Sequence, residues 1–90
     1  MVAEITVEPM GSGRFTVQVD EGGSSSQHEV TVSPQDLERL GAGRTPEVFV
    51  RACFEFLLER EPKESILPAF DIAVIGRYFP EFHATIADTE

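Results

Sequence analysis

The chain has 90 residues, of which 41% are hydrophobic, and its net charge is −9 from sixteen acidic and seven basic residues. This length suits one domain, and we expect residues 1–90 to form a single one. The acidic charge is spread along the chain and leaves no basic patch, so we expect no contact with nucleic acid or with a membrane surface.

Alternating apolar and polar residues in the first third predict three strands. We place these strands near residues 2–8, 14–20 and 28–33, with glycine- and serine-rich turns between them. Residues 21–27 are interpreted as a flexible connection. Three short strands joined in this way predict an antiparallel meander with one apolar and one polar face.

Two helix starts share one sequence signature. Ser33 and Thr45 each offer a capping hydroxyl directly before a proline, and proline is favoured at the first position of a helix. These signals predict helices near residues 34–40 and 46–60. Pro62 ends the second helix, because the residue before a proline is pushed out of the helical region.

The C-terminal third is ambiguous between helix and strand. Residues 70–79 contain both an alternating pattern, which is typical of a strand, and apolar residues three or four apart, which are typical of a helix. Asp71 as an N-cap and Pro80 as a terminator favour a helix near residues 72–79, and the strand remains the alternative. We expect the tail from His83 to be loosely held.

These elements predict an α+β fold in which a three-stranded antiparallel meander is followed by one long and two short helices packed on one face. The long helix is apolar almost all the way round, since only Arg51 and Glu55 are charged between Val48 and Leu58. Such a helix has to be covered on most sides. We expect an uncovered patch to pair two copies into a homodimer, with a monomer covered by its own C-terminal segment as the alternative.

The expected interaction surface consists of aromatic residues from the long helix and the C-terminal segment, because aromatic side chains dominate binding hot spots. The aromatic cluster beside Arg77 has the composition of a docking anchor, and a plug for a small core is its alternative interpretation. The candidate residues are Phe49, Phe56, Tyr78, Phe79 and Phe82.

No catalytic pattern emerges from the polar residues. His28 lies close to Ser24, Ser25 and Ser26, but serines in a flexible loop lack the fixed geometry that a nucleophile and its base need. Cys53 lies in the most apolar segment, which favours an inert thiol. We therefore predict that the protein is not an enzyme and has no catalytic residues, no metal site and no cofactor.

The stretch that begins EFLLEREPKESIL at Glu55 and ends RYFPEF at Phe82 resembles the C-terminal part of a family of small bacterial proteins to which no function is attached. The resemblance includes no catalytic motif. It implies a bacterial protein and transfers no site residues.

The sequence predicts a non-catalytic protein-interaction or regulatory module that is homodimeric. A basic protein partner is a further expectation, drawn from the acidic charge alone. The alternative function is a small-molecule-binding domain with a pocket between sheet and helices near His28, Arg44 and Tyr78. The chain shows no leader pattern and no long apolar run, so we expect a cytoplasmic location.

Overall fold

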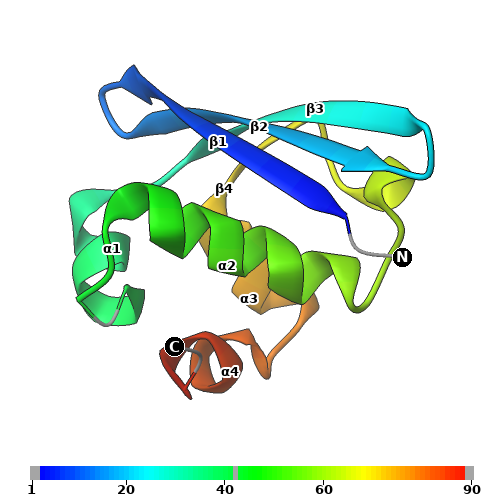
Figure 1. Ribbon diagram of the computed structural model, residues 1–90. Coiled ribbons are helices and arrows are strands. Elements are labelled where there is room, and N and C mark those ends of the chain that lie inside the picture. Colours follow the sequence, from blue (N-terminus) through cyan, green and yellow to red (C-terminus); the bar gives the residue numbers. More distant parts are fainter. Residues whose placement is uncertain (1–2, 42, 89–90) are drawn as a thin grey trace.

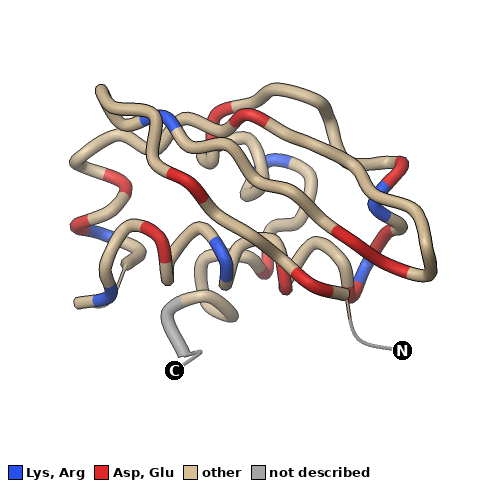
Figure 2. The backbone as a smooth tube through the Cα atoms, turned by 45° about the horizontal axis from the view of Figure 1, so that its top comes forward, with Lys and Arg blue, Asp and Glu red and all other residues tan. Residues whose placement is uncertain are grey.

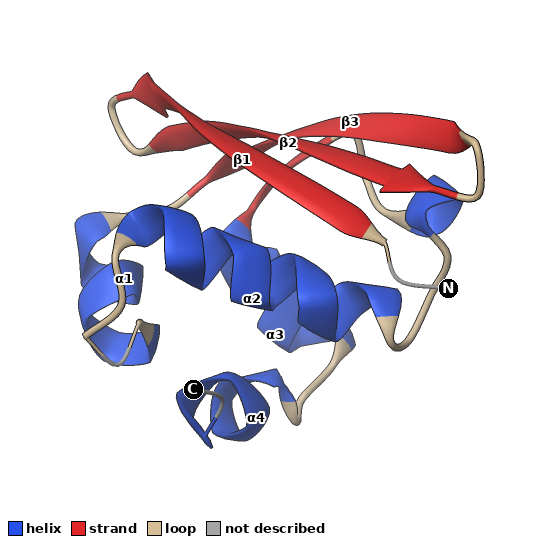
Figure 3. Ribbon diagram, viewed as in Figure 1, coloured by secondary structure: helices blue, strands red, loops and turns tan. Residues whose placement is uncertain are grey.

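The structure is a computed structural model that describes residues 3–41 and 43–88 (Figure 1). It is an α+β fold in which helices α1, α2, α3 and α4 lie on one face of a single sheet (Figure 3). The expected fold class is confirmed at this level. The sheet and the C-terminal segment differ from the prediction in detail.

The sheet has four strands in the order β1-β2-β3-β4. Strands β1 (Glu4–Gly11), β2 (Arg14–Glu21) and β3 (Ser24–Thr31) form the predicted antiparallel meander. Strand β4 (Ala69–Asp71) adds to β3 in parallel, which corrects the three-stranded prediction. A parallel neighbour needs a long crossover, and the helices between β3 and β4 supply it.

The connection between β2 and β3 is a two-residue turn. Gly22 and Gly23 have positive φ angles of 61° and 84°, the backbone conformation that a tight hairpin of this kind requires. The pairing of Glu21 with Ser24 therefore starts β3 four residues earlier than the expected residue 28. The run of serines belongs to the strand, so the interpretation of residues 21–27 as a flexible connection is wrong.

Helices α1 (Pro34–Leu40) and α2 (Pro46–Leu58) begin where the sequence predicts. The hydroxyl of Ser33 accepts a hydrogen bond from the Asp36 amide at 3.1 Å, and the hydroxyl of Thr45 accepts one from the Val48 amide at 3.4 Å. Each cap satisfies an amide that has no partner within its helix.

The ambiguous segment contains both kinds of structure. A short helical turn, η1 (Lys63–Ser65), precedes β4, and two helical pieces, η2 (Ile72–Val74) and α3 (Ile75–Tyr78), follow it. The side chain of Asp71 accepts a hydrogen bond from the Ala73 amide at 2.9 Å, so it caps this helical stretch as expected. The preferred helix near residues 72–79 is thus found over residues 72–78, and the strand alternative holds only for Phe70 and Asp71.

A fourth helix, α4 (Phe82–Asp88), occupies the segment that we expected to be a loose tail. Phe82 is fully buried, and its ring centroid lies 5.1 Å from that of Phe56 in α2. The guanidinium of Arg60 stacks on the Phe56 ring, 3.6 Å from its centroid, and donates a hydrogen bond to the Glu81 carboxylate at 3.1 Å. These contacts hold the start of α4 against α2, which corrects the prediction.

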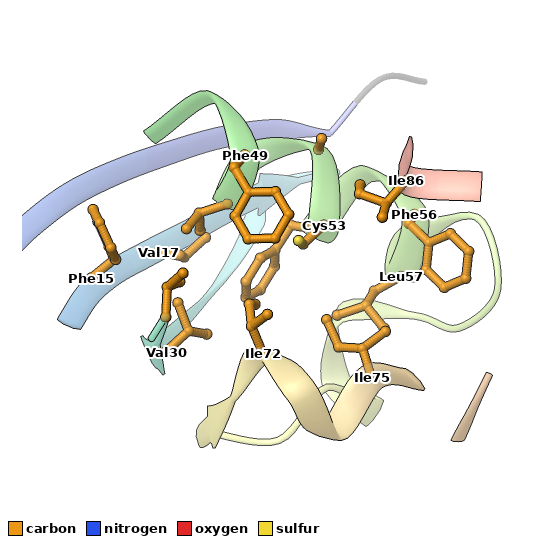
Figure 4. Packing of buried hydrophobic residues seen from close by; sticks show 14 of the residues in the cluster. Phe15, Val17, Val30, Phe49, Cys53, Phe56, Leu57, Ile72, Ile75 and Ile86 are labelled. Carbon is orange, nitrogen blue, oxygen red and sulfur yellow. The ribbon is translucent and has the colours of Figure 1, made fainter. Parts of the chain in front are cut away.

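Helix α2 lies at the centre of the core with nearly all of its apolar surface covered (Figure 4). Val17 and Val30 of the sheet lie on one side of it, and Ile72, Ile75 and Ile86 cover it from others. The uncovered patch that motivated the expected homodimer is therefore closed by the chain itself. The pairing of two copies stays a prediction that needs another surface.

The turn between β1 and β2 yields a testable prediction at Gly13. Its φ angle is +76°, and a Cβ atom added there would lie 2.7 Å from the carbonyl oxygen of Val32. We expect Gly13→Ala to lower the free energy of unfolding by about 2–4 kcal/mol, because a left-handed conformation and a backbone clash both oppose it.

The matched control is Gly11→Ala. Gly11 also has a positive φ angle, +88°, but an added Cβ would meet nothing within 4 Å. This variant should lose only the conformational part, about 1–2 kcal/mol. Urea unfolding of both variants measures the difference, and equal losses would show that the approach of Val32 to Gly13 is not tight.

Candidate functional site

The strand residues that alternate with the buried ones face away from the helices and are mostly polar, and several of them are acidic. Figure 2 shows where acidic residues fall along the chain. Arg14 and Glu29 pair on it at 3.3 Å. A hollow of about 410 Å³ lies at the β2–β3 turn beside Glu4, Asp20 and Glu21. Within residues 3–41 and 43–88, no three His, Cys, Asp or Glu side chains are grouped so that they could hold a metal ion.

An apolar groove of about 320 Å³ lies on the helical side of the molecule, and we call it the α3 groove. Its wall comes from the end of α2, the segment between η1 and β4, β4 itself and α3. Glu61 and Ser65 are its polar members besides the hydroxyl of Tyr78. The apolar and aromatic side chains that define it include Leu57, Ile66, Leu67, Phe70, Tyr78 and Phe79.

Two side chains of the α3 groove are exposed although they are large and mostly apolar. Leu67 is 46% exposed and Tyr78 is 69% exposed. Isolated apolar residues on a surface need no explanation, but exposed ones that line a concave apolar wall are typical of a contact site. The groove is therefore the strongest candidate for a functional site.

The wall that carries Leu67 is tied to β3 by hydrogen bonds. Nδ1 of His28 lies 2.8 Å from the carbonyl oxygen of Leu67 and, because a carbonyl oxygen only accepts, Nδ1 is the donor. Nε2 of the same ring lies 2.8 Å from the hydroxyl oxygen of Ser26, within hydrogen-bond distance. The Glu29 amide donates to the carbonyl oxygen of Pro68 at 2.8 Å. These bonds hold the backbone of Leu67 and Pro68 against β3.

The contact between Ser26 and His28 has the distance of a nucleophile and its base. The group that orients the ring is the backbone carbonyl of Leu67 rather than a carboxylate, and His28 is only 3% exposed. Neither Ser26 nor His28 lines the α3 groove or the hollow at the β2–β3 turn. The contact has a structural explanation, because His28 and the Glu29 amide together hold Leu67 and Pro68 to β3, and we call these hydrogen bonds the latch. The absence of catalysis stays a prediction.

The three residues named for the expected pocket, His28, Arg44 and Tyr78, do not share the α3 groove. Of these residues only Tyr78 lines the α3 groove. Arg44 donates to the carbonyl oxygen of Gly41 at 3.2 Å at the other end of α2. Cys53 is buried, and loss of hydration raises the pKa of its thiol well above the usual range, with a smaller opposing effect from Arg44. Such a thiol is unreactive at neutral pH.

The structure divides the five residues of the expected interaction surface. Phe49, Phe56 and Phe82 are buried in the core, so they cannot contact a partner in the folded chain. Tyr78 and Phe79 line the α3 groove. The expected surface therefore loses these three residues, and within the aromatic cluster beside Arg77 the core-plug alternative holds for Phe82 alone.

The charge of the α3 groove comes from Glu61. Within the described part of the chain, no Lys, Arg or His side chain lies within ion-pair distance of its carboxylate. The nearby Lys63 is 4% exposed and its Nζ donates to Glu64 at 2.7 Å, a hydrogen bond that holds the pKa of the Glu64 carboxyl below its usual value. The groove therefore presents one unpaired negative charge beside an apolar wall.

Sequence reasoning missed Glu61 and Leu67 as members of a site. The pattern around them, which reads EPKESILP, has neither helical nor strand periodicity, so no face could be assigned to its side chains. Pro68 is the one signal in this stretch, because the residue before a proline favours an extended backbone, and here that residue is Leu67.

Comparisons with protein-family models, curated proteins and solved structures gave no match. The function is therefore argued from the site alone. In the part of the chain that the structure describes, no helix has the length and apolar character needed to cross a bilayer.

Proposed function

We propose that this chain is a non-catalytic interaction module that binds a partner protein through the α3 groove. The observation that carries the proposal is the exposure of Leu67 and Tyr78 on the wall of a concave apolar surface. Aromatic and aliphatic anchors of this kind provide most of the binding free energy in protein interfaces.

The latch from β3 supports this proposal. His28 and the Glu29 amide hold the carbonyl oxygens of Leu67 and Pro68 in place before any partner arrives. A binding surface that is already ordered loses less conformational entropy when it binds. A buried histidine that fixes an exposed leucine is thus consistent with a preformed docking site.

The size of the groove favours side chains of a partner over a whole small molecule. Pockets for small molecules usually span about 300–1,000 Å³ and bury most of their ligand. The α3 groove, at about 320 Å³, lies at the lower limit and is open to solvent. Since a cavity of about 150 Å³ holds benzene, the groove has room for roughly two ring-sized groups.

Site-specific photocrosslinking tests the proposal directly. A benzophenone amino acid at Tyr78, introduced in the cells that make the protein, should yield a crosslinked product with a second polypeptide. The same amino acid at Val48, an exposed apolar residue of α2 that does not line the groove, is the matched control. Products that are absent at Tyr78 or identical at both positions would contradict the proposal.

The variant Leu67→Glu provides the second arm of this test. The side chain of Leu67 is nearly half exposed, and only its backbone takes part in the latch, so the fold should survive. A charge in the apolar wall should remove the crosslink from Tyr78 without changing the circular dichroism spectrum.

Homodimer formation and small-molecule binding are the two competing proposals. A crosslinked product of twice the 9.9 kDa chain mass would identify a second copy as the partner. Native mass spectrometry of the purified protein would reveal a bound small molecule as an added mass that Leu67→Glu abolishes.

A further inference from the structure

We infer that the partner contributes a basic amphipathic segment, with apolar side chains in the α3 groove and a Lys or Arg side chain paired with Glu61. This inference rests on the proposed function, and it names the chemical class of the partner.

The charge of the site carries the first step. Glu61 lines the groove, and among the described residues no cation is paired with it. Lys63 cannot serve, since its ammonium group is bound to Glu64 and its side chain is buried. A cation from the partner would pair with Glu61, the charged residue that lines the groove. The apolar residues of the partner beside that cation would cover the apolar wall.

The charge of the whole molecule carries the second step. A net charge of −9, with acidic residues on the sheet and the helices, steers positively charged partners toward the surface (Figure 2). A second copy of the chain would bring the same negative charge and a second Glu61 to the interface. Like charges that face each other oppose association, so a basic partner fits this surface better than self-pairing does.

The short edge strand β4 favours a helical segment of the partner over an extended one. Strand β4 is only three residues long, Ala69–Asp71, so an extended chain that added to it would gain few backbone hydrogen bonds. A helix that places apolar side chains from one face into the groove needs no such edge. The expected segment is therefore helical, with apolar residues at helical spacing and basic residues beside them.

The test uses the full chain and a designed probe. The probe is a fluorescein-labelled peptide of about 15 residues, long enough for partial helicity, with leucines at helical spacing and lysines at most other positions. Its control replaces every lysine with glutamate. Fluorescence anisotropy at two salt concentrations should show binding of the lysine peptide that weakens as salt rises, and no binding of the glutamate peptide.

Two variants with the same change of net charge locate the contact. Glu61→Gln should weaken binding of the lysine peptide about fivefold, the upper range for one partly exposed ion pair. Glu8→Gln removes an exposed carboxylate from β1, at the opposite edge of the sheet, and should leave the affinity nearly unchanged. Equal effects of the two variants would overturn the inference, because attraction would then come from net charge alone.

The remaining outcomes also decide the question. Equal binding of both peptides, or binding of neither, overturns the basic partner. A photocrosslink from Tyr78 to a second copy overturns it as well. If Leu67→Glu leaves binding of the lysine peptide unchanged, the groove is not the site and the proposed function fails. If Leu67→Glu abolishes binding but Glu61→Gln has no effect, only the present inference fails.

Discussion

Replacing Phe54 with alanine should lower the free energy of unfolding by about 3–5 kcal/mol. Phe54 is fully buried in α2. Its ring centroid lies 5.4 Å from that of His28 in β3 and 6.0 Å from that of Phe70 in β4. The ring therefore fills the space where the helix, the meander and the added parallel strand meet, and its removal leaves a cavity that these elements cannot close.

Urea unfolding followed by circular dichroism measures this loss. Domains are stable by only about 5–15 kcal/mol, so the alanine variant could be largely unfolded in buffer. Phe54→Leu keeps most of the volume and should remain folded, with a smaller loss of about 1–3 kcal/mol. Val48→Ala, at a half-exposed position of the same helix, should change stability by less than about 0.5 kcal/mol. A similar loss at both positions would contradict the central place of Phe54.

Replacing His28 with leucine should lower the free energy of unfolding by about 1–3 kcal/mol and loosen the α3 groove. Leucine fills a similar apolar space beside Phe54, but it cannot donate to the carbonyl oxygen of Leu67. The carbonyl oxygen of Leu67, which lies in a part-buried position, then has no protein donor, and an acceptor left unsatisfied costs about 1–3 kcal/mol.

Ser26→Ala is the control for this variant. It removes the hydroxyl that is hydrogen-bonded to Nε2 of His28 but leaves the bond from Nδ1 to Leu67 intact. Because Ser26 is only half-buried, water can replace its hydroxyl, and we expect a loss below about 1 kcal/mol. If Ser26→Ala costs as much as His28→Leu, the anchoring of Leu67 is not what His28 contributes.

The same variants test whether the pair has a chemical role. The wild-type protein and both variants should hydrolyse p-nitrophenyl acetate no faster than buffer does. A rate of hydrolysis above that of buffer that depends on both Ser26 and His28 would contradict the prediction that the protein is not an enzyme. It would assign Ser26 as the nucleophile and His28 as its base.

Local signals predicted the parts of the fold that depend on neighbouring residues in the chain. The capping hydroxyls of Ser33 and Thr45 and the prolines after them placed the starts of α1 and α2 correctly. The alternation in the first third placed β1 and β2. Each of these features is a backbone preference or a hydrogen bond that spans only a few residues, so it can be recognised without the fold.

Features that depend on contacts between distant residues were missed or, like the strand near residue 70, were left as an alternative. Strand β4 is three residues long and exists because Phe70 pairs with Val30 across the sheet. Helix α4 is held by Phe82 and Ile86 against α2, and no cap in the sequence announces it. The serines of β3 were interpreted as flexible because of their composition. The tight turn at Gly22 and Gly23, after which these serines pair with β2, was not recognised.

The residues and their order were enough to predict an acidic α+β fold with an antiparallel meander and a helix that is apolar nearly all round. What covers that helix could be seen only in the folded chain, because burial depends on which distant segments return to it. The C-terminal pieces cover it and turn Phe49, Phe56 and Phe82 into core residues. What stays exposed is the α3 groove, whose Leu67 is held by His28 from 39 positions away in the chain. No local pattern encodes such a contact.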